Sequence, residues 1–220
     1  QKPDIILFTG DLVNDMAKEM HDWMDVFSQL KAPMGVYSVL GNHDYGDYIH
    51  WESVEAKRNN LERLKEIHGE LGWRLLMNEH VALERNGEQV ALIGIENWGK
   101  GSFSKYGKMN IAHKGTEHFA FKILMSHDPS HWDYIVQHHK QHFHLTLSGH
   151  THGMQFGIEI PGYFKWSLVQ YVYKQWAGLY ENKGRYVYVN RGFGFHAYSG
   201  RVGIMPEITV IELKKGNKLV

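Results

Sequence analysis

Four short apolar runs constrain the fold most, because each of them ends in glycine or serine followed by polar side chains. These junctions read FTGD (8–11), LGNHD (40–44), MSHDP (125–129) and SGHTHG (148–153). Continuous apolar runs of this length are typical of buried parallel strands, and the carboxyl ends of parallel strands converge on one crevice. We therefore expect an α/β fold in which the four polar junctions meet.

The rest of the chain alternates strand-like and helix-like segments at first and then becomes mostly strand-like. The Asn86-Gly87 pair between two β-type runs is a strong hairpin signal. The expected elements are strands at 4–10 and 34–41, helices following Asn14 or Asp15 and at 52–71, a hairpin over 80–97, a Gly-rich loop at 98–110, a strand within 119–129, a short helix from 130, and later strands that include 185–190 and 206–213. This order predicts two packed mixed β-sheets flanked by helices, in a single domain over 1–220.

Composition excludes several functional classes. Lys plus Arg and Asp plus Glu both number 24, so no strong positive field favours a nucleic-acid partner. The chain has no cysteine, which excludes disulfide scaffolds, thiolate metal sites and cysteine nucleophiles. It also has no apolar run of membrane-spanning length, so the domain itself is expected to be soluble.

The polar junctions offer metal ligands of mixed type. The candidates are one carboxylate, one amide oxygen and three imidazoles, from Asp11, Asn42, His127, His150 and His152. This mixture suits Mn, Zn or Fe better than Ca or Mg, which prefer oxygen ligands alone. Taken singly, each junction could instead be a turn, a helix cap or a structural histidine. Their joint occurrence, each directly after a strand, favours a metal site.

Together the junctions resemble motifs II to V of the calcineurin-like metallophosphoesterases. The resemblance covers nearly the whole chain and implies a four-layer sandwich, two divalent metal ions, and hydrolysis of a phosphoester or pyrophosphate by a hydroxide that both ions activate. It implies the following roles: Asp11 bridges the ions, Asn42, His127 and His150 complete one site, His152 serves the other, His43 is the general acid, and Asp44 holds the His43 imidazole.

One family motif has no counterpart in this sequence. The family pattern begins with Asp-x-His on an earlier strand, and no Asp-x-His lies upstream of Asp11. We therefore expect a domain truncated at its N-terminus, without its first strand. One metal should be held well and the second weakly, since only Asp11 and His152 would serve it, and hydrolysis should be slow or absent. The exposed strand edge could also pair with a second copy.

The substrate class is suggested by what the motifs lack and by the C-terminal third. Leu40 precedes GNHD, and GDLVND contains no arginine, so a Ser/Thr protein phosphatase is not expected. Segment 161–180 mixes aromatic residues with lysine, which suits either a bilayer interface or ordinary core packing. The tail resembles a bacterial, membrane-anchored branch that includes enzymes cleaving UDP-diacylglucosamine. We expect a lipid-linked substrate first and a nucleotide second.

Several residues outside the motifs are candidate substrate contacts. Arg191 could clamp a phosphate and His196 could reach the crevice, as could Tyr45 and the 98–107 loop. The parent protein would be membrane-associated through segments outside this sequence, on a side of the membrane that the residues leave open. The alternative to an enzyme is a non-catalytic module that binds a metal or a lipid.

Overall fold

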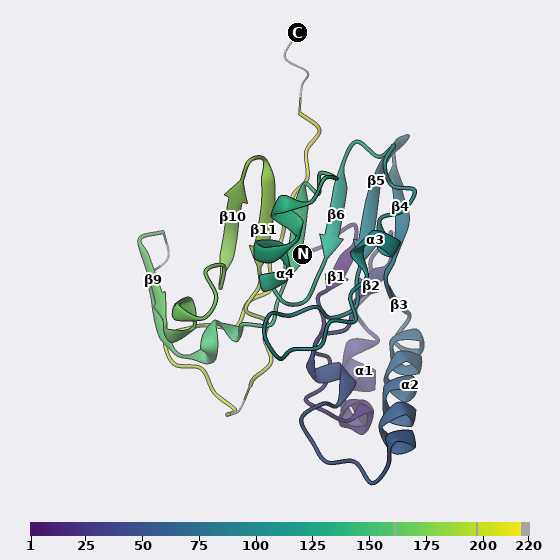
Figure 1. The fold of residues 1–220 in the computed structure, drawn as a ribbon, viewed down its shortest axis with the longest axis vertical. Coiled ribbons are helices and arrows are strands. Elements are labelled where there is room, and N and C mark those ends of the chain that lie inside the picture. The colour runs from purple at the N-terminus through teal and green to yellow at the C-terminus, as the bar shows by residue number, and fades with distance from the viewer. Residues whose placement is uncertain (161, 197, 217–220) are drawn as a thin grey trace.

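The computed structural model describes residues 1–160, 162–196 and 198–216, and two stacked sheets form its centre (Figure 1). The smaller sheet has the order β1-β2-β3 and is parallel throughout. Its strands are β1 (Ile6–Phe8), β2 (Val36–Ser38) and β3 (Trp73–Leu75). Within the described residues β1 pairs with β2 alone, so the predicted pairing of β1 with a second copy stays a prediction.

The larger sheet is mixed and has the order β10-β11-β7-β6-β5-β4. Its strands are β4 (Glu79–Arg85), β5 (Glu88–Gly94), β6 (Lys122–Met125), β7 (Leu145–Ser148), β10 (Gly178–Asn182) and β11 (Arg185–Val189). β5, β6, β7 and β11 run parallel, and antiparallel β4 and β10 close the two sides. Asn86 and Gly87 both have positive φ, as the predicted two-residue hairpin turn requires.

Helices cover the outer face of each sheet and complete a four-layer sandwich. α1 (Met24–Phe27) and α2 (Val54–Glu70) lie on the smaller sheet, while α3 (Met109–Ala112) and α4 (Ser130–Tyr134) lie on the larger one (Figure 1). α2 begins after Ser53, whose side chain accepts a hydrogen bond from the amide of Ala56. The predicted sandwich of two packed sheets flanked by helices is confirmed, although the described smaller sheet is parallel and only the larger one is mixed.

Strict alternation along the strands produces these layers. In β1, Leu7 packs between the two sheets, whereas Phe8 faces the helical layer with α2. In β5, Leu92 packs between the sheets and Ile93 faces the layer that contains α3 and α4. Central strands such as β6 and β7 therefore bury both of their faces, which explains the continuous apolar runs in the sequence.

Two predicted elements differ from the structure. The helix expected after Asn14 is a 3-10 helix, Ala17–Trp23, followed by the single turn of α1. The Glu19 side chain accepts hydrogen bonds from three backbone amides there, which favours the tighter turn. The strand expected at 206–213 does not form, because no described neighbouring strand supplies hydrogen bonds and Ile208 and Val210 are exposed.

The chain also forms a separate hairpin, β8 (Gly157–Ile160) and β9 (Phe164–Ser167). It lies at the periphery of the molecule, to the left of β10 in Figure 1. Among the residues that the structure describes, no helix combines the length and the apolar character needed to cross a bilayer.

Candidate metal centre

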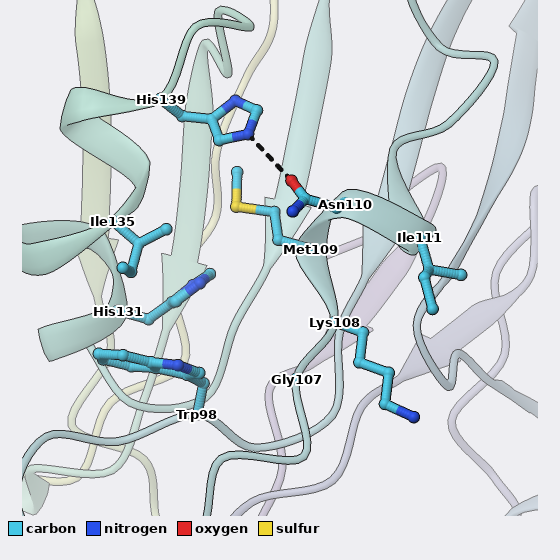
Figure 2. Close-up of a pocket in the computed structure, with 9 residues that line it drawn as sticks. All are labelled: Trp98, Gly107, Lys108, Met109, Asn110, Ile111, His131, Ile135 and His139. Carbon is cyan, nitrogen blue, oxygen red and sulfur yellow. Dashed lines mark hydrogen bonds between the residues drawn. The ribbon is translucent and has the colours of Figure 1, made fainter.

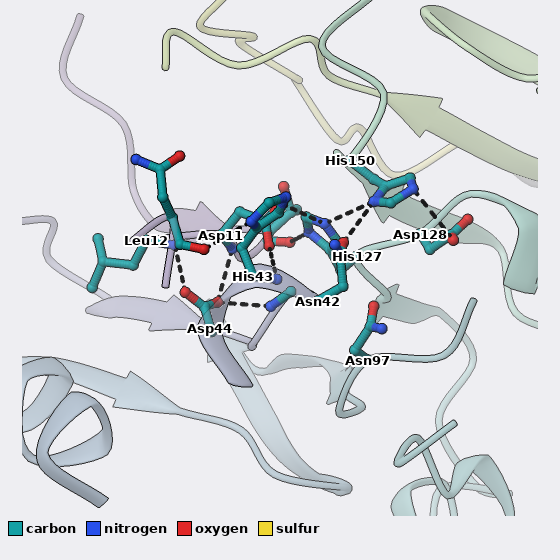
Figure 3. A network of polar contacts seen from close by, with 12 residues as sticks. Asp11, Leu12, Asn42, His43, Asp44, Asn97, His127, Asp128 and His150 are labelled. Carbon is teal, nitrogen blue, oxygen red and sulfur yellow. Dashed lines mark hydrogen bonds and ion pairs between the residues drawn. The ribbon is translucent and has the colours of Figure 1, made fainter. Parts of the chain in front are cut away.

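The loops that follow β1, β2, β6 and β7 meet at one edge of the two sheets (Figure 3). Asp11, His127 and His150 each offer one ligand atom there, and these atoms lie within 4.8 Å of one another. The three residues come from three different strand ends, because parallel strands direct their carboxyl ends to the same side of a sheet. The topology therefore brings together side chains that are far apart in the sequence.

His127 and Asp11 form a buried ion pair within this group. Nδ1 of His127 donates to the carbonyl of Thr9 at 2.7 Å, and Nε2 lies 3.0 Å from Oδ2 of Asp11. Burial alone would lower the pKa of His127, but the neighbouring Asp11 carboxylate raises it to about 9. Burial would likewise raise the pKa of Asp11, yet the positive charge of His127 holds it well below its usual value. The carboxylate thus requires a positive charge beside it.

The donor atoms fit a metal ion. Within the described parts of the chain, the buried Oδ2 of Asp11 and Nδ1 of His152 have no hydrogen-bond partner of good geometry. Buried polar atoms are rarely left unpaired unless something else binds them. A cation between these residues would supply the charge that the His127 imidazolium provides in this structure, and it would leave Nε2 of His127 free to act as a ligand.

His150 and Asn42 extend the same group of donors. Nδ1 of His150 lies 2.8 Å from Oδ1 of Asn42 and 3.3 Å from Nε2 of His127. Burial lowers the pKa of His150 to about 4, so its imidazole is neutral at pH 7, as a metal ligand must be. The Asn42 amide nitrogen donates to the hydroxyl of Tyr48 at 2.7 Å, which turns the amide oxygen toward His150.

Tyr173 and Asp128 lie on the Nε2 side of the His150 ring. The sequence analysis did not predict either residue as part of the site. Nε2 of His150 lies 2.7 Å from the Tyr173 hydroxyl, which in turn donates to Oδ2 of Asp128 at 3.4 Å. Burial, and then the Asp128 charge, raises the pKa of Tyr173, so the phenol keeps its proton. Asp128 directly follows His127 and could have been suspected from the motif. Nothing in the sequence pairs Tyr173 with His150.

Asp44 does not hold the His43 imidazole as predicted. Its fully buried carboxylate accepts hydrogen bonds from four backbone amides, those of Asp11, Leu12, Val13 and Gly41. Nδ1 of His43 instead donates to the carbonyl of Asn14 at 2.8 Å. The amides of two tightly packed loops occupy both Asp44 oxygens, so Asp44 shapes the loop that carries Asp11.

Close backbone contact and strain mark the centre. A Cβ on Gly41 would lie 2.1 Å from Oδ1 of Asp11, and one on Gly10 would lie 2.5 Å from the amide nitrogen of Gly41. Asp11, His150 and His152 adopt left-handed φ values of 59°, 68° and 50°. Non-glycine residues rarely adopt this conformation, and it is concentrated at functional sites.

His152 and His196 lie beside the three-residue group. The His152 ring stacks on that of His196 with centroids 5.9 Å apart, and the His196 ring lies 5.5 Å from that of His43. Burial lowers the pKa of His152 to about 4, so it too is neutral at pH 7. The structure thus places His196, which lies far along the chain, next to the predicted general acid.

Arg191, the predicted phosphate clamp, forms two ion pairs in this structure. Its Nε donates to Oε2 of Glu207 at 2.7 Å, and its Nη1 pairs with Glu159. Two carboxylates therefore surround its single positive charge, and no pattern in the sequence indicates either partner. Tyr45 is likewise engaged, since its hydroxyl donates to Glu96 at 3.0 Å. The 98–107 loop does reach the centre, because the Phe103 ring lies 5.1 Å from that of His150.

A cavity of about 400 Å³ lies apart from this centre, between α3 and α4 (Figure 2). Trp98, Met109, His131 and His139 are among its lining residues, and none of the predicted ligands is. The candidate site is therefore the polar convergence at the strand ends and not this cavity.

A four-layer α/β sandwich with carboxylate, amide and imidazole donors at its strand ends defines a metal-dependent phosphoesterase. The chain belongs to the calcineurin-like phosphoesterase family, whose model matches residues 1–154. The family consists of hydrolases that use divalent metal ions. The matched region includes every predicted metal ligand, whereas Tyr173, Arg191 and His196 lie beyond it.

Individual relatives agree with this assignment. The chain is 28% identical over 211 residues to the uncharacterized metallophosphoesterase YkoQ of Bacillus subtilis strain 168, covering 95% of this chain and 72% of YkoQ. It is 24% identical over 243 residues to the UDP-2,3-diacylglucosamine pyrophosphatase LpxG of Chlamydia trachomatis serovar D, covering 87% and 68%. Its fold is similar to that of the sulfate thiohydrolase SoxB of Thermus thermophilus, with a TM-score of 0.51, 13% identity, and coverage of 84% of this chain and 33% of SoxB.

Proposed function

We propose that this protein hydrolyses the phosphoester or pyrophosphate bond of a lipid-linked substrate, with a nucleotide as the second choice. The observation that carries the proposal is the convergence of ligand atoms from Asp11, His127 and His150 within 4.8 Å, at the carboxyl ends of parallel strands. LpxG, by its name, acts on a diacylated nucleotide sugar, and this similarity supports a lipid-linked pyrophosphate.

The residues present would hold divalent ions unequally. Asp11, Asn42, His127 and His150 would bind one ion, and Asp11 with His152 would serve a second. When bound, the ions supply positive charge that stabilises the charge developing on the phosphoryl oxygens. Mn, Zn or Fe suits this mixed donor set best.

His43 is proposed to deliver the proton to the departing oxygen. The Asn14 carbonyl accepts from Nδ1 of His43 and thereby fixes the ring, which leaves Nε2 for the substrate. A carbonyl can only accept, so Nδ1 carries a proton in either charge state. His196, at a ring distance of 5.5 Å, would contact the substrate beside His43.

The first prediction concerns metal content. After dialysis against Mn, Zn or Fe, mass spectrometric metal analysis should find about one tightly held ion per chain, because two ligands rarely hold a second ion firmly. His127→Asn should remove this ion, and Asp22→Asn, a change at an exposed surface residue, should not. Two tightly held ions per chain would contradict the unequal sites, and none would contradict the metal centre.

A substrate panel tests the chemistry. UDP-diacylglucosamine, bis-p-nitrophenyl phosphate and nucleotides would be assayed with each of the three metals. We expect slow hydrolysis by this chain that disappears with His127→Asn and persists with Asp22→Asn. If no ester is hydrolysed even at metal concentrations high enough to fill the weaker second site, the non-catalytic module becomes the better explanation.

A further inference from the structure

The β8–β9 hairpin separates apolar from polar residues completely. Its register pairs Ile158 with Trp166 and Ile160 with Phe164, so these four side chains share one face. Phe156 and Leu168, the next positions outward, continue that face. We call this set the hairpin face: Phe156, Ile158, Ile160, Phe164, Trp166 and Leu168.

The opposite face of the hairpin is already bound to the body of the protein. Ser167 is fully buried, and its hydroxyl donates to the carbonyl of Gly153. A Cβ on Gly157 would lie 2.9 Å from the side chain of Ile204, which shows how closely this side packs. Glu159, on the same side, pairs with Arg191. The hairpin therefore has a fixed orientation, and its apolar face points outward.

The hairpin face is exposed except at Trp166, which is half-buried. Its members Phe156, Ile158, Ile160, Phe164 and Leu168 are each 45–56% exposed, and Tyr163 at the tip is 91% exposed. A contiguous apolar patch of this kind marks an interaction surface on a water-soluble domain. It carries no charged residue, since the Glu159–Lys165 pair lies on the other side.

We propose that the hairpin face seats this protein on the surface of an anionic lipid bilayer. The chemistry favours lipid over a protein partner. Tyr163 and Trp166 combine an apolar ring with a polar group, as residues at the headgroup level do. Glu159, the one acid of segment 156–180, pairs with Arg191 on the opposite side of the hairpin, where Lys165 also donates to the carbonyl of Ala177. Lys174 is therefore the exposed cation of this segment that is left for the headgroups. Lysine is depleted at protein interfaces, whereas an anionic membrane attracts it.

The position of this surface connects it with the metal centre. The hydrogen bond from Ser167 to the carbonyl of Gly153 joins the base of the hairpin to the loop that carries His152, so a bilayer in contact with the hairpin face would hold lipid headgroups near that loop. The inference thus rests on the proposed function and deepens it, because it explains how a lipid-linked phosphoester would reach the ligands.

Vesicle sedimentation with the 220-residue chain tests the proposal. Wild-type protein should pellet with phosphatidylglycerol vesicles and bind phosphatidylcholine vesicles more weakly. The double variant Ile160→Ser/Phe164→Ser removes an opposed apolar pair and should lose at least about tenfold in vesicle affinity. The matched control Val26→Ser/Val54→Ser changes two exposed apolar residues on α1 and α2 and should bind within about twofold of wild type.

Manganese content, measured on the same samples, separates failure of the surface from failure of the site. All three proteins should retain the same metal, since the hairpin face contains no ligand. Equal vesicle binding by the hairpin variant and wild type would overturn the proposal, as would no binding by wild type. Concentration-dependent dimerisation that the hairpin variant abolishes, without vesicle binding, would instead assign the face to a second copy. Vesicle binding without metal or hydrolysis would leave the surface standing and reject the proposed function.

Discussion

At the scale of single residues, the centre depends on side chains that orient the ligands. His150 could present either ring nitrogen, and the Tyr173 hydroxyl at 2.7 Å from Nε2 selects Nδ1 for the side facing Asn42 and His127. The fully buried Asp128 accepts a hydrogen bond from the Tyr173 hydroxyl and thereby completes this series of polar contacts. Partners of this kind fix the tautomer and orientation of a histidine ligand.

Tyr173→Phe should therefore weaken metal binding about 10- to 100-fold, because Nε2 of His150 loses its acceptor while the ring remains packed. Titration calorimetry with Mn would measure the change. Tyr171→Phe is the matched control, since Tyr171 is 76% exposed and should bind metal as wild type does. Equal affinities for the two variants would show that Tyr173 does not position His150.

At the scale of elements, β1 and β2 must approach closely to place their polar ends together. Gly10 and Gly41 make this approach possible, because a side chain at either position would collide with the opposite loop. Asp44 then ties the two loops together through four amides. The metal centre is thus held by backbone contacts as much as by the strands.

Gly41→Ala should lower the free energy of unfolding by about 1–3 kcal/mol, because the new methyl group overpacks against Asp11. It should also release the bound metal. Gly69→Ala is the contrasting control. Gly69 lies in α2 with open space around it, so alanine there should stabilise the protein by about 0.5–1 kcal/mol. Guanidinium unfolding and metal analysis would measure both effects. Wild-type stability and metal content in the Gly41→Ala variant would refute the close contact.

At the scale of the whole molecule, stability should depend on a buried histidine that is not one of the candidate metal ligands. His68 on α2 packs fully buried beside Ser38, and burial lowers its pKa to about 4 from 6.5. Above pH 6.5 the residue is neutral both folded and unfolded. Between pH 6.5 and 4 the unfolded chain binds a proton that the folded protein excludes, so stability is lost as the pH falls through this range.

The wild-type protein should accordingly lose about 3 kcal/mol through His68 alone between pH 7 and pH 4. His68→Gln should show a shallower decline in unfolding free energy over this range, measured by denaturant unfolding at a series of pH values. His21→Gln, at a position whose side chain is 90% exposed, should follow the wild-type curve. A His68→Gln curve parallel to wild type would contradict the predicted linkage.

The sequence by itself determined the layers and indicated the candidate ligands. Alternating and continuous apolar runs are local patterns, so they specify which face of each strand is buried, as Leu92 and Ile93 illustrate. The polar ends of the strands indicated Asp11, Asn42, His127, His150 and His152 as candidate ligands, because parallel strands direct such ends to one edge. These inferences need only periodicity and position along the chain.

Only the tertiary structure decided which side chains pair around those ligands. Tyr173 reaches His150 across 23 positions, and Asp44 binds the amide of Asp11 across 33. Arg191 pairs with Glu207 across 16 positions, an ion pair that no local pattern indicates. A hydrogen bond depends on distances of a few ångströms, which packing sets after the chain has folded, and no periodicity in the sequence encodes them.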